Sequence, residues 1–268
     1  MHVDLHTHSA FSFDAPSTST ASAMCEAAIA KGITHLAITD HCDLTPDTPR
    51  DFTLLDATFE GLQAAKAEYA DRLALLVGIE LGQANHHPSL AREILNRHSY
   101  DFVLGSIHNL RDVEDFYYMD FSSMPQDEIN ALFARAIDET AALCDIEGIH
   151  SIAHITYIHR YLCRDGRSID FSAFKRPLTA LFQKMVTRGI ALEVNTSTLP
   201  TLGITLPERE LLLLYRECGG RLLSVGSDAH TPEKIAAGFD ALGARLRACG
   251  FDELITPTKS GLITQRLG

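Results

Sequence analysis

The chain lacks the features that mark membrane, secreted and disulfide-rich proteins. Its 268 residues contain no apolar run of the about 18 residues that a membrane span requires. Its start lacks the charged and then apolar segments of a signal peptide. The six cysteines show no Cys-x-x-Cys spacing, which is typical of free thiols in a reducing compartment. We therefore expect a cytoplasmic protein without a membrane partner.

Basic residues are also scarce. The chain has 23 Lys and Arg against 35 Asp and Glu, and its formal net charge is −12. Contacts with nucleic-acid phosphates need clustered Lys and Arg, and the sequence contains no such cluster. We therefore expect no nucleic-acid partner, and the sequence leaves the oligomeric state open. Low-complexity tracts, repeats and linkers are missing too, so we expect one domain over residues 1–268.

What the chain does contain is an alternation of short apolar runs with helical stretches. We expect strands near residues 2–7, 35–39, 73–79, 101–106, 150–154, 190–195 and 221–227, and helices over 21–31, 56–70, 126–144, 207–219 and 233–248. Strands that alternate with helices are typical of a parallel sheet covered by helices. We expect an α/β fold with a closed or nearly closed barrel, and an open doubly wound sheet is the alternative.

Imidazole and carboxylate side chains follow the predicted strands, beginning with His6 and His8. Residues two apart on a strand point to the same side, so these imidazoles are suited to share a metal ion. In a parallel barrel, functional groups gather at the C-terminal ends of the strands. Nine candidate ligands occupy six of these seven ends or the loops beyond them: His6, His8, Asp14, His41, Glu80, His108, His154, Asp228 and His230. Their coincidence predicts a metal-dependent catalytic site.

These motifs resemble those of the PHP (polymerase and histidinol phosphatase) family. The resemblance rests on His6-x-His8, Thr39-Asp40-His41, Glu80, His108, His154 and Asp228-x-His230. Within that family the chain is most similar to the monofunctional histidinol-phosphate phosphatases, through residues 105–108, 153–154, 160–161, 192–197 and 226–231. The resemblance implies a distorted (β/α)7 barrel with a metal centre at the C-terminal ends of the strands.

The resemblance also implies three divalent metal ions, for which the mixed ligand set suits Zn, Fe or Mn. One ion would be held by His6, His8, Glu80 and Asp228, a second by Glu80, His108 and His154, and the third by Asp14, His41 and His230. Glu80 would bridge the first two ions. The implied catalytic residues are Glu80, Asp228, His230 and Arg160, and Arg160 and His230 would also contact the substrate.

The reaction expected from this resemblance is hydrolysis of a phosphate monoester, L-histidinol phosphate, as part of histidine biosynthesis. A metal-bridging hydroxide would attack phosphorus. Residues 109–121 carry acidic and aromatic side chains that suit an ammonium or imidazole group. One departure leaves the substrate open. The histidinol-phosphate phosphatases continue after the position of Ser197 with glycine and a basic residue, whereas this chain continues with Thr198-Leu199-Pro200-Thr201-Leu202-Gly203.

Other functions fit parts of the pattern. A metal-dependent amidohydrolase also opens with His-x-His, but such barrels have eight strands and often a lysine on strand four, which this chain lacks. A PHP phosphoesterase for another small phosphate ester or a nucleotide is a nearer alternative. A non-catalytic metal-binding scaffold is the third, although scaffolds usually lose ligands. Asp4 and Asp40 are either partners that orient the imidazoles or plain solvated carboxylates.

Overall fold

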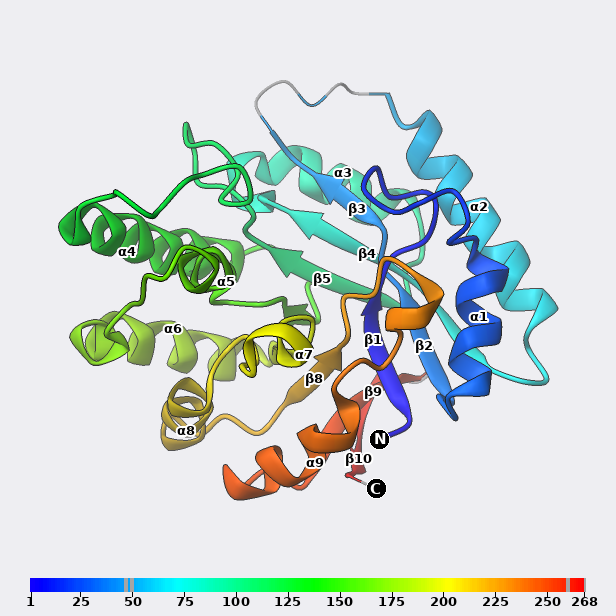
Figure 1. Cartoon of the computed structure of the whole chain (residues 1–268). Helices are drawn as coiled ribbons and strands as arrows, with labels where there is room; N and C mark the ends of the chain where they lie inside the picture. The colour runs from blue at the N-terminus through cyan, green and yellow to red at the C-terminus, as the bar shows by residue number, and fades with distance from the viewer. Residues whose placement is uncertain (46–47, 49–50, 259–260, 268) are drawn as a thin grey trace.

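A parallel sheet forms the centre of the molecule (Figure 1). The computed structural model describes residues 1–45, 48, 51–258 and 261–267. The sheet runs in the order β1, β2, β4, β5, β6, β7, β8. These strands are Val3–Thr7, His35–Ile38, Ala74–Gly82, Phe102–Ser106, Ser151–Ile152, Ala191–Asn195 and Leu223–Gly226. Each of the seven predicted strands is present.

The sheet closes on itself where β1 and β8 end. The backbone N–H of His8 donates to the carbonyl of Ala229 at 2.8 Å, and that of Asp228 donates to the carbonyl of His6 at 2.8 Å. These bonds pair the two edges that an open sheet would leave exposed. The expectation of a nearly closed (β/α)7 barrel is therefore confirmed, and the doubly wound alternative is excluded.

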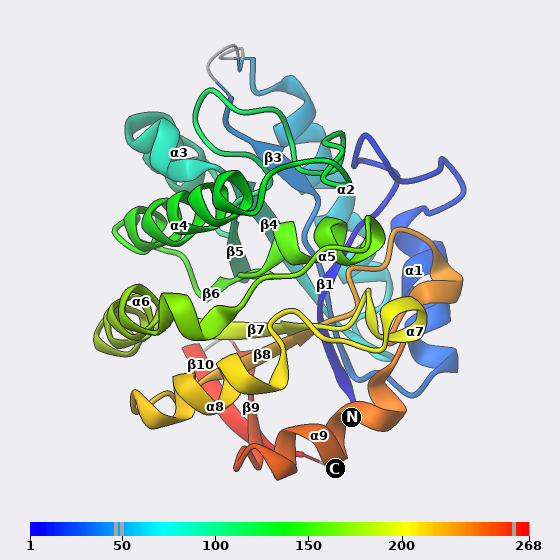
Figure 2. The ribbon, with the colours of Figure 1, turned by 60° about the vertical axis from the view of Figure 1, so that its left-hand side comes forward.

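The helices lie around the outside of the barrel, except for α5 and α7, which lie at the C-terminal ends of the strands (Figure 2). They are α1 Ala21–Ala30, α2 Thr53–Glu68, α3 Pro88–Arg97, α4 Gln126–Leu143, α5 Tyr157–Arg164, α6 Lys175–Arg188, α7 Leu199–Leu202, α8 Arg209–Glu217 and α9 Phe239–Ala248, with 3₁₀ turns η1 Ala84–His86, η2 Phe171–Phe174 and η3 Pro232–Lys234. Apolar residues at helical spacing explain the packing: α4 buries Ile129, Phe133 and Ile137. None of the helices described is long and apolar enough to cross a bilayer.

Four helices, α3, α5, α6 and α7, were not expected from the sequence, and one expected helix differs. The prediction of a continuous helix over 233–248 is wrong in its first part. The chain forms η3 and then passes through left-handed conformations at Ala236 (φ 55°) and Gly238 (φ 81°) before α9 begins. A left-handed residue cannot continue a right-handed helix, so α9 starts after Gly238.

Three strands lie outside the predicted set. β3 (His41–Asp43) pairs with β4 in a register that sets His41 beside Glu80. β9 (Glu253–Thr258) and β10 (Gly261–Arg266) form an antiparallel pair. Ile255 of β9 is fully buried in a cluster with barrel residues such as Val3 and Leu5. This hairpin therefore closes the barrel interior at the N-terminal ends of the strands and leaves the other end for the site.

Candidate metal centre

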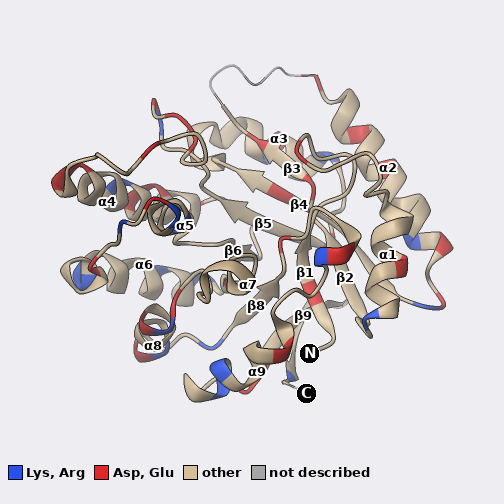
Figure 3. Cartoon of the chain, in the orientation of Figure 1, with Lys and Arg blue, Asp and Glu red and all other residues tan. Residues whose placement is uncertain are grey.

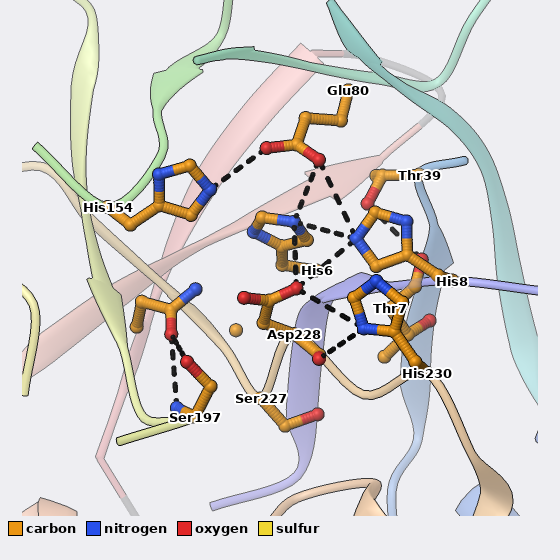
Figure 4. Close-up of polar contacts among 12 residues, drawn as sticks. His6, Thr7, His8, Thr39, Glu80, His154, Ser197, Ser227, Asp228 and His230 are labelled. Atoms are coloured by element: carbon orange, nitrogen blue, oxygen red, sulfur yellow. Dashed lines mark hydrogen bonds and ion pairs between the residues drawn. The ribbon is translucent and has the colours of Figure 1, made fainter. Parts of the chain in front are cut away.

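The nine predicted ligands converge at the C-terminal end of the barrel, and Figure 4 shows six of them together. β1 supplies His6, and His8 directly follows the strand. An irregularity in the pairing of β1 with β2 lies between Asp4 and Thr7. β4 supplies Glu80 and β3 supplies His41, while the remaining ligands follow β5, β6 and β8 or lie in the loop after β1. The side chains of His6, His8 and Glu80 are fully buried.

One set of donor atoms gathers around one carboxylate oxygen of Glu80. His6 Nε2 lies 3.4 Å and His8 Nε2 3.6 Å from Glu80 Oε2. Asp228 closes this set, because its Oδ1 lies 3.3 Å from His8 Nε2 and 3.7 Å from His6 Nε2. Two imidazoles and two carboxylates thus face one small volume, which is a donor set that divalent transition metals accept.

The other oxygen of Glu80 faces a second set. Oε1 lies 3.1 Å from His108 Nε2 and 3.0 Å from His154 Nε2. The two sets therefore share one carboxylate, with a different oxygen toward each. A carboxylate in this position is suited to bridge two neighbouring cations.

A third set lies nearer to solvent. Asp14 Oδ2 is 3.0 Å from His230 Nε2 and 3.6 Å from His41 Nε2. Donor atoms of His8, His41 and His230 also lie within 4.8 Å of one another. His41 connects this set to the interior, because its Nδ1 lies 2.8 Å from Glu80 Oε2. Asp14, a loop residue, is thus brought to the site as expected.

The chemistry of His6 and His8 fits a cation between them. Glu193 accepts from His6 Nδ1 at 2.6 Å. Ser12 Oγ donates to Asp40 at 2.7 Å, so it accepts from His8 Nδ1 at 3.1 Å. Each Nδ1 therefore has its own partner, and the two Nε2 atoms face each other at 3.1 Å. When both Nε2 atoms are free of protons, their lone pairs are placed to bind a shared cation.

Several residues that the sequence did not single out hold the imidazoles in place. Glu193, on β7, binds the His6 ring and also accepts from the backbone N–H of His154 at 2.8 Å. Asp43 Oδ1 lies 3.1 Å from His108 Nδ1. Carboxylates in such positions fix the tautomer of a ligand imidazole and raise its basicity. A signal for Glu193 exists in the sequence: it is the one charged residue of the five-residue buried strand Ala191–Asn195.

The two aspartates that the sequence left open have different roles. Asp40 accepts from the Ser9 and Ser12 hydroxyls, so it acts on His8 through Ser12. Asp4 accepts instead from Ser227 N, Ser227 Oγ and Ala236 N. It therefore anchors the loop after β8, from which Asp228 and His230 project. Both are buried, so neither is a solvated carboxylate.

The electrostatics keep the carboxylates ionised. Burial opposes the charge on Glu80 and Asp228, but the surrounding imidazoles hold the pKa of each carboxyl well below its ordinary value. Burial, with His41 and His230, lowers the pKa of His8 well below its ordinary value. Burial likewise opposes charge on His6, but Glu193, Glu80 and Asp228 raise its pKa. Protons and a metal ion would therefore compete for the nitrogens of this site.

Arg160 lies at the edge of the cluster. Its Nη1 is 3.7 Å from Asp228 Oδ2, and its side chain is 30% exposed. Three tyrosines lie next to one another beside Arg160. The Tyr161 hydroxyl donates to the Tyr157 hydroxyl at 2.7 Å, and the exposed ring of Tyr117 contacts the Tyr161 ring edge-on. The Tyr157 ring lies 5.0 Å from that of His154. The segment 109–121 thus reaches the site through these rings.

Comparison with known proteins agrees with this geometry. The model of the PHP domain family matches residues 4–197. The chain belongs to the PHP domain family. The histidinol-phosphatase of Lactococcus lactis is 25% identical over 260 residues, which span 95% of this chain and 93% of that protein. A relative from Clostridium acetobutylicum, named a probable histidinol-phosphatase, is 27% identical over 240 residues. These residues span 88% of this chain and 89% of the relative.

A solved structure has the same fold over nearly the full length. It is the histidinol phosphate phosphatase of Lactococcus lactis with zinc, L-histidinol and phosphate. It superposes with a TM-score of 0.78 at 24% identity and covers 98% of each chain. The expected PHP family and barrel are thereby confirmed, and the expectation of a phosphatase agrees with the names of these relatives.

Proposed function

We propose that this PHP domain protein is a metal-dependent phosphatase that hydrolyses L-histidinol phosphate to L-histidinol and phosphate. The position of Glu80 carries the proposal. One of its oxygens faces His6 and His8, and the other faces His108 and His154. A shared carboxylate between two imidazole sets serves the hydrolysis of phosphate esters by neighbouring metal ions.

The ligand allocation expected from the sequence is the one that we propose. The first ion would be held by His6, His8, Glu80 and Asp228, the second by Glu80, His108 and His154, and the third by Asp14, His41 and His230. Divalent ions held by these residues would lower the pKa of a bound water, for which we propose the bridging hydroxide expected above, and would neutralise charge on the phosphoryl oxygens. Glu193 and Asp43 would keep the ligand imidazoles oriented.

Arg160 is proposed to bind the phosphoryl group of the substrate. A guanidinium group presents several donors in a planar fork that matches phosphate. Within the described residues, Arg160 is the one Lys or Arg that forms an ion pair with any of the nine candidate ligands. His230, 24% exposed at the outer side of the cluster, is the second proposed substrate contact.

The proposed substrate rests on the relatives and on the aromatic edge of the site. The two relatives are named as histidinol-phosphatases, and the solved structure contains L-histidinol and phosphate. In this chain the Tyr161 ring centre lies 6.0 Å from the guanidinium carbon of Arg160, Tyr161 donates to Tyr157, and Tyr117, which is 58% exposed, contacts Tyr161 edge-on. Flat rings of this kind suit an imidazole-bearing leaving group.

A second candidate is phosphatase activity on a different small phosphate ester. The observation that favours it is the segment after Ser197, where α7 (Leu199–Leu202) brings no basic residue to the site. Arg160 would then hold the phosphoryl group without a second arginine. Weaker binding of the phosphoryl group would lower the specificity of the enzyme for one substrate.

Phosphate release from a substrate panel separates these candidates. Purified protein would be stripped with a chelator, reloaded with Mn, Zn or Fe, and given histidinol phosphate, nucleotides and sugar phosphates. We expect no activity without metal and the highest kcat/KM with histidinol phosphate. Equal rates on the generic esters would refute the substrate assignment, and full activity in the metal-free protein would refute the metal-dependent reaction itself.

A further inference from the structure

A cavity lined by arginines lies at the end of the barrel opposite the metal centre. It has a volume of about 480 Å³, and the ends of α8, α9, β9 and β10 border it. Figure 3 shows basic residues on these elements along one side of the molecule. Arg221 lies just before β8, whereas Asp228 follows β8, so the strand separates them by roughly 20 Å at about 3.3 Å per residue.

The cavity carries positive charge in an otherwise acidic protein. Arg216, Arg221, Arg247 and Arg266 line it, together with only two carboxylates, Asp252 and Glu253. The formal net charge of the chain is −12. Within the part of the chain that the structure describes, none of these four arginines forms an ion pair. Four guanidinium groups against two carboxylates leave the lining with a positive balance, which favours the binding of an anion.

Two of the arginines are held in place by backbone carbonyls. Arg216 Nε donates to Gly250 O at 3.0 Å, and its guanidinium carbon lies 5.6 Å from the centre of the Phe251 ring. Arg216 Nη1 is buried and has no hydrogen-bond partner. Arg221 Nη1 donates to Gly220 O at 2.7 Å. Backbone carbonyls carry no formal charge, so these contacts fix the guanidinium groups and leave their positive charge for an anion in the cavity.

We propose that this cavity binds an anion that carries two or more linked phosphate groups. Guanidinium groups pair with phosphate oxygens in a bidentate way. A volume of about 480 Å³ lies within the range of small-molecule sites and would be mostly unfilled by a single phosphate. The part of the ligand that this cavity would bind is the polyphosphate group, which inorganic diphosphate and a nucleoside triphosphate share. This site does not depend on the reaction proposed for the metal centre.

Hydrogen–deuterium exchange of the metal-loaded protein tests the proposal, because it locates binding along the chain. Inorganic diphosphate and ATP are added in separate arms. We expect slower exchange in peptides that contain the end of α8, the end of α9 and β10, independently of any protection near the metal centre. Protection in both arms identifies the polyphosphate group as the ligand feature, and protection by ATP alone would overturn that assignment.

The variant Arg247→Gln/Arg266→Gln removes two exposed arginines that line the cavity and whose side chains form no hydrogen bond or ion pair within the described residues. We expect it to weaken diphosphate binding at this site by about tenfold or more and to leave phosphatase activity unchanged. The control Arg92→Gln/Arg176→Gln removes the same charge from exposed positions on α3 and α6. Equal weakening in both double variants, or no protection of these peptides in the wild-type protein, would overturn the proposal.

Discussion

The inner and outer parts of the metal centre differ in how the chain holds them. His6 and Glu80 come from strands, His8 directly follows β1, and the side chains of all three are fully buried. Asp14 comes from a loop and is 40% exposed, and His230 follows β8 and is 24% exposed. Strands of a closed barrel fix their side chains through backbone pairing on both sides, whereas a loop residue depends on its own contacts. The inner part is therefore preorganised, and the outer part is adaptable.

The supporting residues show the same difference. The Nδ1 atoms of His6 and His8 are bound by Glu193 and Ser12, which are both buried. His230 Nδ1 donates instead to the backbone carbonyl of Asp228, only two residues away. A carboxylate behind an imidazole raises its basicity, and a local carbonyl does so less. We therefore expect the inner ions to bind more tightly than the outer one.

The largest effect is expected from Glu80→Gln. The amide would remove the charge that both inner sets share, so kcat/KM for phosphate release should fall by on the order of 10³-fold or more, since several kcal/mol of transition-state stabilisation are lost. Glu139→Gln is the matched control, because Glu139 also binds an imidazole, that of His86, outside the site. Comparable loss of activity in both variants would show that the effect is structural.

A smaller effect is expected from Asp14→Asn, which acts on the outer set alone. Contacts with His230 and His41 hold the pKa of Asp14 well below its ordinary value although burial opposes its charge, so the carboxylate is present at neutral pH. Loss of this carboxylate should weaken the binding of the outer metal ion by about 100-fold. Activity measured against metal concentration should then recover at high metal. Activity that stays low at saturating metal would assign Asp14 a different role.

Glu193→Gln should have a still smaller effect, because glutamine keeps an acceptor for His6 but removes the charge behind it. We expect metal affinity and kcat to fall by about tenfold and KM to stay nearly constant. Glu208→Gln is the control, since Glu208 pairs with His159 at 3.0 Å away from the metal ligands. A raised KM with unchanged metal affinity would contradict a positioning role for Glu193.

The smallest effect is expected outside the site, at Asp56. Hydrogen bonds from Arg97 lower the pKa of Asp56 from 3.8 to about 2 and link α2 to α3. Because the pKa of Asp56 is lower in the folded protein, its ionised carboxylate stabilises the fold at any pH above the ordinary pKa of 3.8. This stabilisation is lost as the pH falls through about 2. Asp56→Asn should therefore lower Tm slightly at neutral pH, with a difference that vanishes near pH 2 and with unchanged activity. A difference in Tm that persists at pH 2 would contradict this origin.

The parts of the molecule that the sequence predicts are those with a local signal. Strand-end residues such as His6, Glu80 and His108 were identified because a barrel brings strand ends together. Glu193 was missed as an orienting residue because it lies within its strand, and only the barrel interior reveals its imidazole partner. The hairpin β9–β10 was missed because its role depends on the contact of Ile255 with distant strands. Long-range packing has no short sequence pattern.

Metal content per chain tests the central claim most directly. Elemental analysis of purified, metal-loaded protein would compare the wild type with Asp14→Asn and Glu80→Gln at equal free metal. We predict three divalent ions per chain in the wild type, two in Asp14→Asn and at most one in Glu80→Gln, because Glu80 faces both inner sets. A wild-type protein with a single ion, or a Glu80→Gln variant that keeps the full wild-type content, would contradict a cluster built around a shared carboxylate.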